Sequence, residues 1–121
     1  MYMPVPKLVD AWLGKTPLIA NDPDLQGIYS ADDELADLIE FSPETAWEFI
    51  LEASARELSE KRRCFLAAGL LEDLLGKHGE KLISKVELEA RNCPGFKALL
   101  SGVWQGRMPG PIWARVQNAK K

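Results

Sequence analysis

Residues 64–77 read CFLAAGLLEDLLGK, and this stretch decides the fold class of the chain. Its apolar residues recur every four positions in two adjacent rows, which is the pattern of an α-helix with a broad apolar face. The rows are Leu66, Leu70 and Leu74, and Ala67, Leu71 and Leu75. A face this wide must be covered on more than one side, so we expect a central helix here. Lys77, His78 and Gly79 are predicted to end it, with Gly79 free to take the left-handed conformation.

The same helical periodicity continues over most of the chain, and no alternating stretch is long enough for a confident strand. Further apolar faces lie at residues 5–12, 35–39, 47–58, 82–90, 96–104 and 112–116. Short connections between the later segments favour antiparallel neighbours. We therefore predict a single all-α domain over residues 1–121, a compact bundle or α-hairpin stack of six to seven helices.

Individual residues predict where helices begin and end. Ser30 and Ser42 are placed as N-caps, and Ser42 is followed by Pro43 at the first helical position. The bases at residues 61–63 either end the preceding helix, where cations complement the helix dipole, or fill a short turn.

The four tryptophans are assigned by their neighbours in the sequence. Trp12, Trp47 and Trp104 fall on apolar faces, so we expect them to be buried. Trp113 lies between Pro111 and Arg115 and is expected to be partly exposed, which makes it the best aromatic candidate for a partner contact.

Nothing in the sequence is typical of a secreted or membrane protein. The first residues lack a basic region followed by a long apolar run, and no stretch reaches the ~18 apolar residues of a membrane span. We therefore expect a cytoplasmic protein, in which Cys64 and Cys93 are small buried hydrophobes rather than a disulfide. The chain has one histidine and no cysteine pair at zinc spacing, so no metal and no cofactor is predicted.

Charge divides the chain into two halves. Residues 1–60 hold thirteen carboxylates and three cationic side chains, net −10, and residues 61–121 hold five and twelve, net +7, which together give the formal charge of −3. Such a division concerns partners and solubility rather than fold. One interpretation is that the charges lie on solvated helix faces, or that the two halves face one another.

The other interpretation is a docking surface, because an acidic surface attracts a basic partner and raises the association rate. The candidate partner-binding residues are Asp32, Asp33, Glu34, Asp37, Glu40, Glu44 and Glu48. We therefore expect a non-enzymatic protein-binding module with a basic protein partner. An immunity or inhibitor protein that neutralises a nuclease toxin is one form of such a module.

The basic half suggests an alternative function, a nucleic-acid-associated accessory protein. Its candidate residues are Lys61, Arg62, Arg63, Lys97, Arg107, Arg115, Lys120 and Lys121. No helix-turn-helix signature accompanies them, and the acidic half would repel phosphate, so this alternative ranks second.

A third possibility is a small ligand-binding protein or enzyme centred on Glu72, His78 and Arg91. Glu72 and His78 are about 9 Å apart along a helix that rises ~1.5 Å per residue, so they are poorly placed to act together. The structural interpretation is favoured, in which His78 caps a helix C-terminus and Glu72 pairs with Arg91 across two antiparallel helices. No nucleophile stands beside a base and no phosphate loop occurs, so no catalytic residue is predicted.

Residues 67–104 resemble a bacterial family of small helical proteins known only as a domain of unknown function. The shared pattern is G-x-x-E-D-L-L-x-x-H-G, followed by A-R and by L-x-G-V-W. It falls on Gly69, Glu72, Asp73, Leu74, Leu75, His78, Gly79, Ala90, Arg91, Leu100, Gly102, Val103 and Trp104. Residues 10–12 and 43–47 also look like this family. The resemblance implies a shared fold and implies no activity.

Overall fold

The computed structural model describes residues 4–13 and 31–121, and it describes residues 31–33 by their backbone alone. Its helices are α1 (Val5–Trp12), α2 (Ala31–Phe41), α3 (Pro43–Ser54), α4 (Glu60–Phe65), the π-helix η1 (Leu66–Leu71), α5 (Glu72–Asn92), α6 (Pro94–Leu100) and α7 (Gly110–Ala119). Because α4, η1 and α5 follow one another without a break, the described residues form six helical rods and no strand. The prediction of an all-α fold is confirmed.

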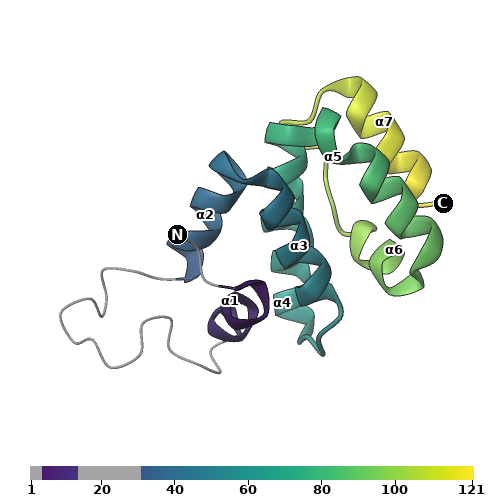
Figure 1. Ribbon diagram of the computed structural model, residues 1–121. Helices are drawn as coiled ribbons and strands as arrows, with labels where there is room; N and C mark the ends of the chain where they lie inside the picture. The colour runs from purple at the N-terminus through teal and green to yellow at the C-terminus, as the bar shows by residue number, and fades with distance from the viewer. Residues whose placement is uncertain (1–3, 14–30) are drawn as a thin grey trace, which may run out of the picture.

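The α4–η1–α5 rod is the centre of the molecule. Figure 1 shows α1, α2 and α3 on one side of α5, with α6 and α7 on the other. Leu66, Leu71, Leu74 and Leu75 of this rod are fully buried, so the broad apolar face is covered on both sides as predicted. Edge-to-face aromatic pairs join the outer helices, with ring centroids 5.6 Å apart for Trp12 and Phe49, and 5.4 Å apart for Trp47 and Phe96.

Several predicted helix boundaries are wrong. The third helix was expected to reach Leu58, but α3 ends at Ser54. The bases at residues 61–63 lie inside α4, and the Ser59 hydroxyl caps this helix by accepting a hydrogen bond from the Arg62 amide at 3.2 Å. At the start of α3, Pro43 occupies the first turn as predicted, but the Ser42 side chain makes no capping hydrogen bond. The predicted cap at Ser30 lies outside the described residues.

The predicted helix end at Lys77–Gly79 is a kink. His78 has non-helical backbone angles (φ −133°, ψ 28°), so α5 consists of two helical segments that meet here, and the predicted interruption of the helix is confirmed. Gly79 is not left-handed, since positive φ occurs among the described glycines at Gly106 (φ 52°). A Cβ atom at Gly79 would lie 2.8 Å from Ile112 Cγ2. Glycine is therefore needed here for the close approach of α7 rather than for its backbone freedom.

Burial confirms most of the aromatic predictions and corrects one. Trp12 and Trp47 are buried, and Trp113 is partly exposed, as predicted. Trp104 is 74% exposed, so its predicted burial is wrong. The helix that should have carried it inward stops at Leu100, and the chain turns before Trp104.

Both cysteines are free, but neither is fully buried as predicted. Cys64 is exposed, which corrects the prediction, because the apolar run that contains it is too wide for every member to face the core. Cys93 is half-buried and packs against the core.

Candidate functional site

The acidic half presents a row of carboxylates on α3. Glu44, Glu48 and Glu52 follow at intervals of four residues, so they share one face of the helix. Glu44 and Glu48 are exposed and form no ion pair with any described residue. Glu52 is held by Arg56, whose Nε lies 2.9 Å from Glu52 Oε2 and whose Nη1 lies 2.6 Å from Asp10 Oδ1. Both hydrogen bonds raise the pKa of Arg56, and the one to Asp10 has the larger effect.

The predicted docking residues of α2 have different surroundings. Asp37 is exposed and, within the described part of the chain, makes no ion pair. Glu34 is 2% exposed, so its carboxylate is not part of the described surface. The side chains of Asp32 and Asp33 lie outside what the structure describes.

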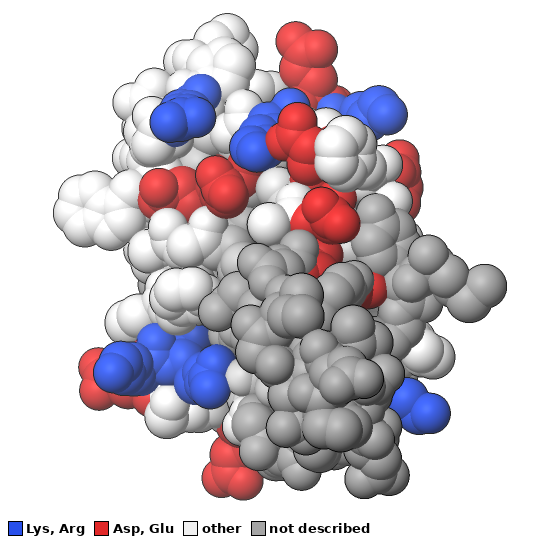
Figure 2. All heavy atoms as spheres, turned by 90° about the vertical axis from the view of Figure 1, so that its left-hand side faces the viewer, with Lys and Arg blue, Asp and Glu red and all other residues white. Residues whose placement is uncertain are grey.

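Glu40, another predicted docking residue, is neutralised within the molecule. Its Oε2 accepts a hydrogen bond from Lys77 Nζ at 2.7 Å, which lowers the pKa of Glu40 and raises that of Lys77. On the face shown in Figure 2, acidic and basic side chains lie close together over the upper part of the molecule, and a basic group with acidic side chains beside it lies at the lower left. The two halves of the chain therefore neutralise each other at this pair, but not along Glu44 and Glu48.

An apolar hollow borders the acidic row. A space of about 390 Å³ between α1 and α3 is lined by Val5, Pro6 and Leu51 together with Glu48 and Glu52. Lysine and arginine side chains have an aliphatic stem that packs on apolar surface and a charged end that stays in contact with polar groups. This hollow with an acidic edge can therefore accommodate a basic side chain of a partner.

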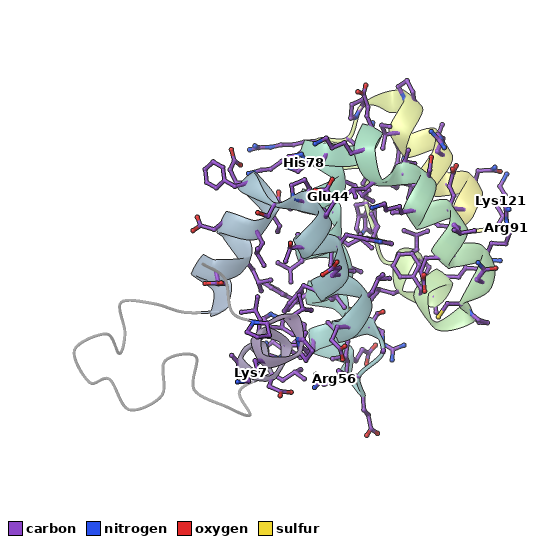
Figure 3. The ribbon with its side chains drawn as sticks, in the orientation of Figure 1. Lys7, Glu44, Arg56, His78, Arg91 and Lys121 are labelled. Atoms are coloured by element: carbon purple, nitrogen blue, oxygen red, sulfur yellow. The ribbon has the colours of Figure 1, made fainter. Side chains whose placement is uncertain are left out.

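The polar residues Glu72, His78 and Arg91 are not brought together. All three belong to α5, but nineteen residues and the kink at His78 separate Glu72 from Arg91. Figure 3 shows His78 and Arg91 at different places along α5, with Arg91 near Lys121. The predicted Glu72–Arg91 pair is absent from the described ion pairs, since the Glu72 carboxylate is bound instead by the Trp104 amide.

Each of these residues has a separate position. The His78 Nε2–H donates a hydrogen bond at 2.7 Å to the Ile39 carbonyl in the last turn of α2, so this ring caps α2 rather than its own helix. Glu72 Oε1 accepts a hydrogen bond from the Trp104 amide at 3.0 Å. Arg91 is exposed. The arrangement does not form one acid–base site.

Two glycines, Gly102 of the motif and Gly106 outside it, also position the segment between α6 and α7. A Cβ atom at Gly106 would lie 2.7 Å from Glu72 Oε2, and one at Gly102 would lie 3.3 Å from Ala67 Cβ. These glycines let the turns after α6 approach η1 and the start of α5. The motif residues therefore hold this part of the chain in place.

The basic residues of the second half are distributed rather than gathered. Arg115 pairs with Glu87, with Nη2 and Oε1 2.5 Å apart. Lys120 donates to the Val103 carbonyl at 2.7 Å, and Lys97 donates to the Lys121 carbonyl at 2.5 Å. The bases of α4 make none of the described ion pairs and remain the clearest basic group.

Sequence reasoning missed a groove along the outer face of the central rod. Two hollows, of about 730 and 490 Å³, share Ala68 and Gly69 in their linings and therefore lie next to each other along this face. Phe65 lines the larger one and is 51% exposed. The available signal was the excess width of the apolar face, which left Phe65 and Cys64 without room inside.

Two kinds of chemistry have no support among the described residues. They contain no group of three or more His, Cys, Asp or Glu side chains that could hold a metal ion. None of the described helices is long and apolar enough to cross a membrane.

The fold and these surfaces define an all-α domain whose motif residues have structural contacts. The chain belongs to a family of unknown function, DUF6869, whose model matches residues 23–121. Comparison with curated proteins found no match, and comparison with solved structures found none either.

Proposed function

We propose that this protein is a non-enzymatic module that binds a basic protein partner through the outer faces of α2 and α3. Asp37, Glu44 and Glu48 are the charged contact residues. The observation that carries the proposal is the exposed pair Glu44 and Glu48, four residues apart and without a cation among the described side chains. Like charges at this spacing cost about 0.2–0.5 kcal/mol, so Glu48 does not serve helix stability, whereas Glu44 also lies in the first turn, where the helix dipole favours an acid.

The surroundings of this pair also support a protein partner. The apolar hollow beside Glu48 offers contact area for the stem of a lysine or arginine, while the carboxylates at its edge attract the charged end. Electrostatic complementarity of this kind raises the association rate and selects the partner. An inhibitor that covers the positive substrate site of a nuclease would use such a surface, and a cytoplasmic bacterial immunity protein belongs to this class.

The test begins with the partner itself. The product of the gene beside this one in the native host, or a protein recovered by pull-down, is purified and its Kd measured by calorimetry at several salt concentrations. We expect the variant Asp37→Lys/Glu44→Lys/Glu48→Lys to bind at least ~10-fold more weakly, with a smaller dependence on salt. The matched control is Glu80→Lys, an exposed glutamate on α5, which should bind as the wild type does. Equal affinities for the triple variant and the wild type would refute the proposal.

A stability measurement separates this effect from a folding defect. Glu48 lies four residues from both Glu44 and Glu52, so Glu48→Lys replaces two repulsions by two attractions. We expect the free energy of unfolding in urea to rise by about 0.5–1 kcal/mol while partner affinity falls. A variant that is both less stable and weaker in binding would instead indicate a role of Glu48 in folding.

A further inference from the structure

The groove along α4, η1 and α5 has an apolar half and a mixed polar half. Its larger hollow is lined mainly by apolar surface, including Trp12, Phe65 and Ala68. The adjoining hollow extends past Glu72 and Asp73 to Lys77 and Arg107. Residues 61–77 span about 24 Å at ~1.5 Å per residue, which is the length of a short peptide segment rather than of a small metabolite.

The apolar half of the groove lies beside the basic group of α4. Lys61 and Arg63 are exposed, and the guanidinium of Arg62 stacks over the Trp12 ring, 4.9 Å from its centroid. None of these three bases takes part in a described ion pair. Glu60 is the acidic residue of α4, so the helix carries a net charge of +2.

Trp12 provides an independent observation in the same hollow. Its side chain lines the groove and is 4% exposed, and its buried Nε1–H has no hydrogen-bond acceptor among the described residues. An unsatisfied buried donor is unfavourable, so a ligand in the groove that brings an acceptor to this N–H would be favoured.

We propose that this groove binds an acidic peptide segment of a partner protein, with an apolar side chain against Phe65 and Trp12 and carboxylates beside Lys61, Arg62 and Arg63. Charge complementarity argues for the acidic segment, since the cations of α4 make no described ion pair. A peptide fits better than a nucleic acid, because Glu72 and Asp73 in the other half would repel a uniformly charged phosphate chain. The charge of a peptide, unlike that of a phosphate chain, can differ from one part of its length to another.

The binding experiment uses the full chain and labelled peptides of about ten residues, followed by fluorescence anisotropy. One peptide contains glutamate and leucine, a second lysine and leucine, and a third glutamate and serine. We expect the glutamate–leucine peptide to bind at least ~10-fold more tightly than either of the others. Equal binding of the glutamate–serine peptide would overturn the apolar half of the proposal. Preferential binding of a single-stranded oligothymidylate would overturn the whole of it.

Variants locate the site. Lys61→Glu/Arg63→Glu and Phe65→Ser should each raise the Kd of the glutamate–leucine peptide by at least ~10-fold. The matched controls are Lys81→Glu/Lys85→Glu, which reverses two exposed charges of α5, and Phe41→Ser, which removes another exposed phenylalanine. Binding that depends on the controls as much as on the groove residues would overturn the assignment.

A spectroscopic signal reports on Trp12 directly. The four tryptophans have four indole N–H resonances, and a Trp12→Phe variant identifies the one from Trp12. We expect this resonance to move on addition of the glutamate–leucine peptide, while that of Trp113 stays in place. A peptide that binds without moving the Trp12 resonance does not occupy this groove. The test uses no residue of the acidic surface on α2 and α3, so its failure and the failure of the proposed function are distinguishable.

Discussion

The N-terminal helices and the C-terminal helices use their polar side chains in opposite ways. In α1–α3 the contacts between helices are largely apolar, as in the Trp12–Phe49 pair, and carboxylates such as Glu48 are left outside. From α5 onward, polar side chains bond to backbone groups of other segments, as Glu72 does with the Trp104 amide and Lys120 with the Val103 carbonyl. Part of the charge in the first region, at Glu44 and Glu48, stays exposed and makes no described ion pair, whereas much of the charge in the second region holds the fold together.

The physical reason lies in the segment between α6 and α7. Residues 101–109 contain no regular helix, so part of their backbone must find hydrogen-bond partners elsewhere. The side chains of Glu72 in α5 and of Lys120, the residue after α7, supply two of them. Each prediction below compares a substitution that alters a contact within the fold with a matched substitution at a less constrained residue or with the wild type. They are given in order of decreasing effect.

Gly106→Ala should have the largest effect. The left-handed conformation costs a residue with a Cβ atom roughly 1–2 kcal/mol, and the new Cβ would displace the Glu72 carboxylate. Together these effects should lower the free energy of unfolding in urea by about 2–3 kcal/mol. Gly110→Ala is the control, since no atom lies within 4 Å of its Cβ position, and it should change stability little. Equal effects of the two substitutions would contradict the role of Gly106.

Gly79→Ala should follow, at about 1–3 kcal/mol, because its Cβ would overlap Ile112 and separate α7 from α5. The control within the same helix is Gly76→Ala. A Cβ atom there would lie 3.4 Å from its nearest neighbour, Arg107 Cβ. That substitution should raise stability by about 0.5–1 kcal/mol, because alanine favours a helix. Thermal unfolding of both variants makes the comparison. Stabilisation by Gly79→Ala would show that α5 and α7 are not closely packed there.

Glu72→Ala should cost about 1 kcal/mol, since it removes the charged acceptor of the Trp104 amide. Amide hydrogen exchange should show faster exchange at Trp104 in particular. Glu48→Ala in the first region should leave stability within about 0.5 kcal/mol of the wild type, because Glu48 is exposed and makes no described ion pair. If Glu48→Ala proves the more damaging of the two, the contrast between the regions is wrong.

The smallest effect should appear in the pH dependence of stability. The hydrogen bond from Arg115, together with its charge, lowers the pKa of Glu87 below the ordinary value of 4.5. This pair therefore stabilises the fold above that pH, and the contribution is lost as the pH falls through the lowered pKa. Between about pH 5 and pH 3 the unfolding free energy should fall less steeply in Glu87→Gln than in the wild type. Parallel curves for Glu87→Gln and the wild type would contradict the prediction.

Sequence reasoning succeeded where one periodic signal dominated and failed where two segments had to meet. The broad face of residues 64–77 correctly predicted a central helix, since burying leucines outweighs most local preferences. Gly79 was misinterpreted because a glycine that permits a left-handed turn and one that permits close packing look the same in a sequence. Trp104 was misplaced because the pattern extended the sixth helix past Leu100.

The candidate site illustrates the same limit. The acidic character of the first half and the basic character of the second can be counted from residues 1–60 and 61–121. The sequence does not show which of these charges stay unpaired, because Glu40 pairs with Lys77, thirty-seven residues further along the chain. The groove beside Phe65 was equally invisible, since it depends on α1 and α4 lying together.

The order of residues was enough to establish a helical fold with one central rod, because helical periodicity is a local property that each segment carries. The fate of each carboxylate and each aromatic ring was settled by packing between helices. That packing paired Glu40, left Glu44 and Glu48 exposed, and turned Trp104 outward. The energetic effect of a charge or an apolar surface depends on neighbours that are distant in sequence, and only the folded chain brings those neighbours together.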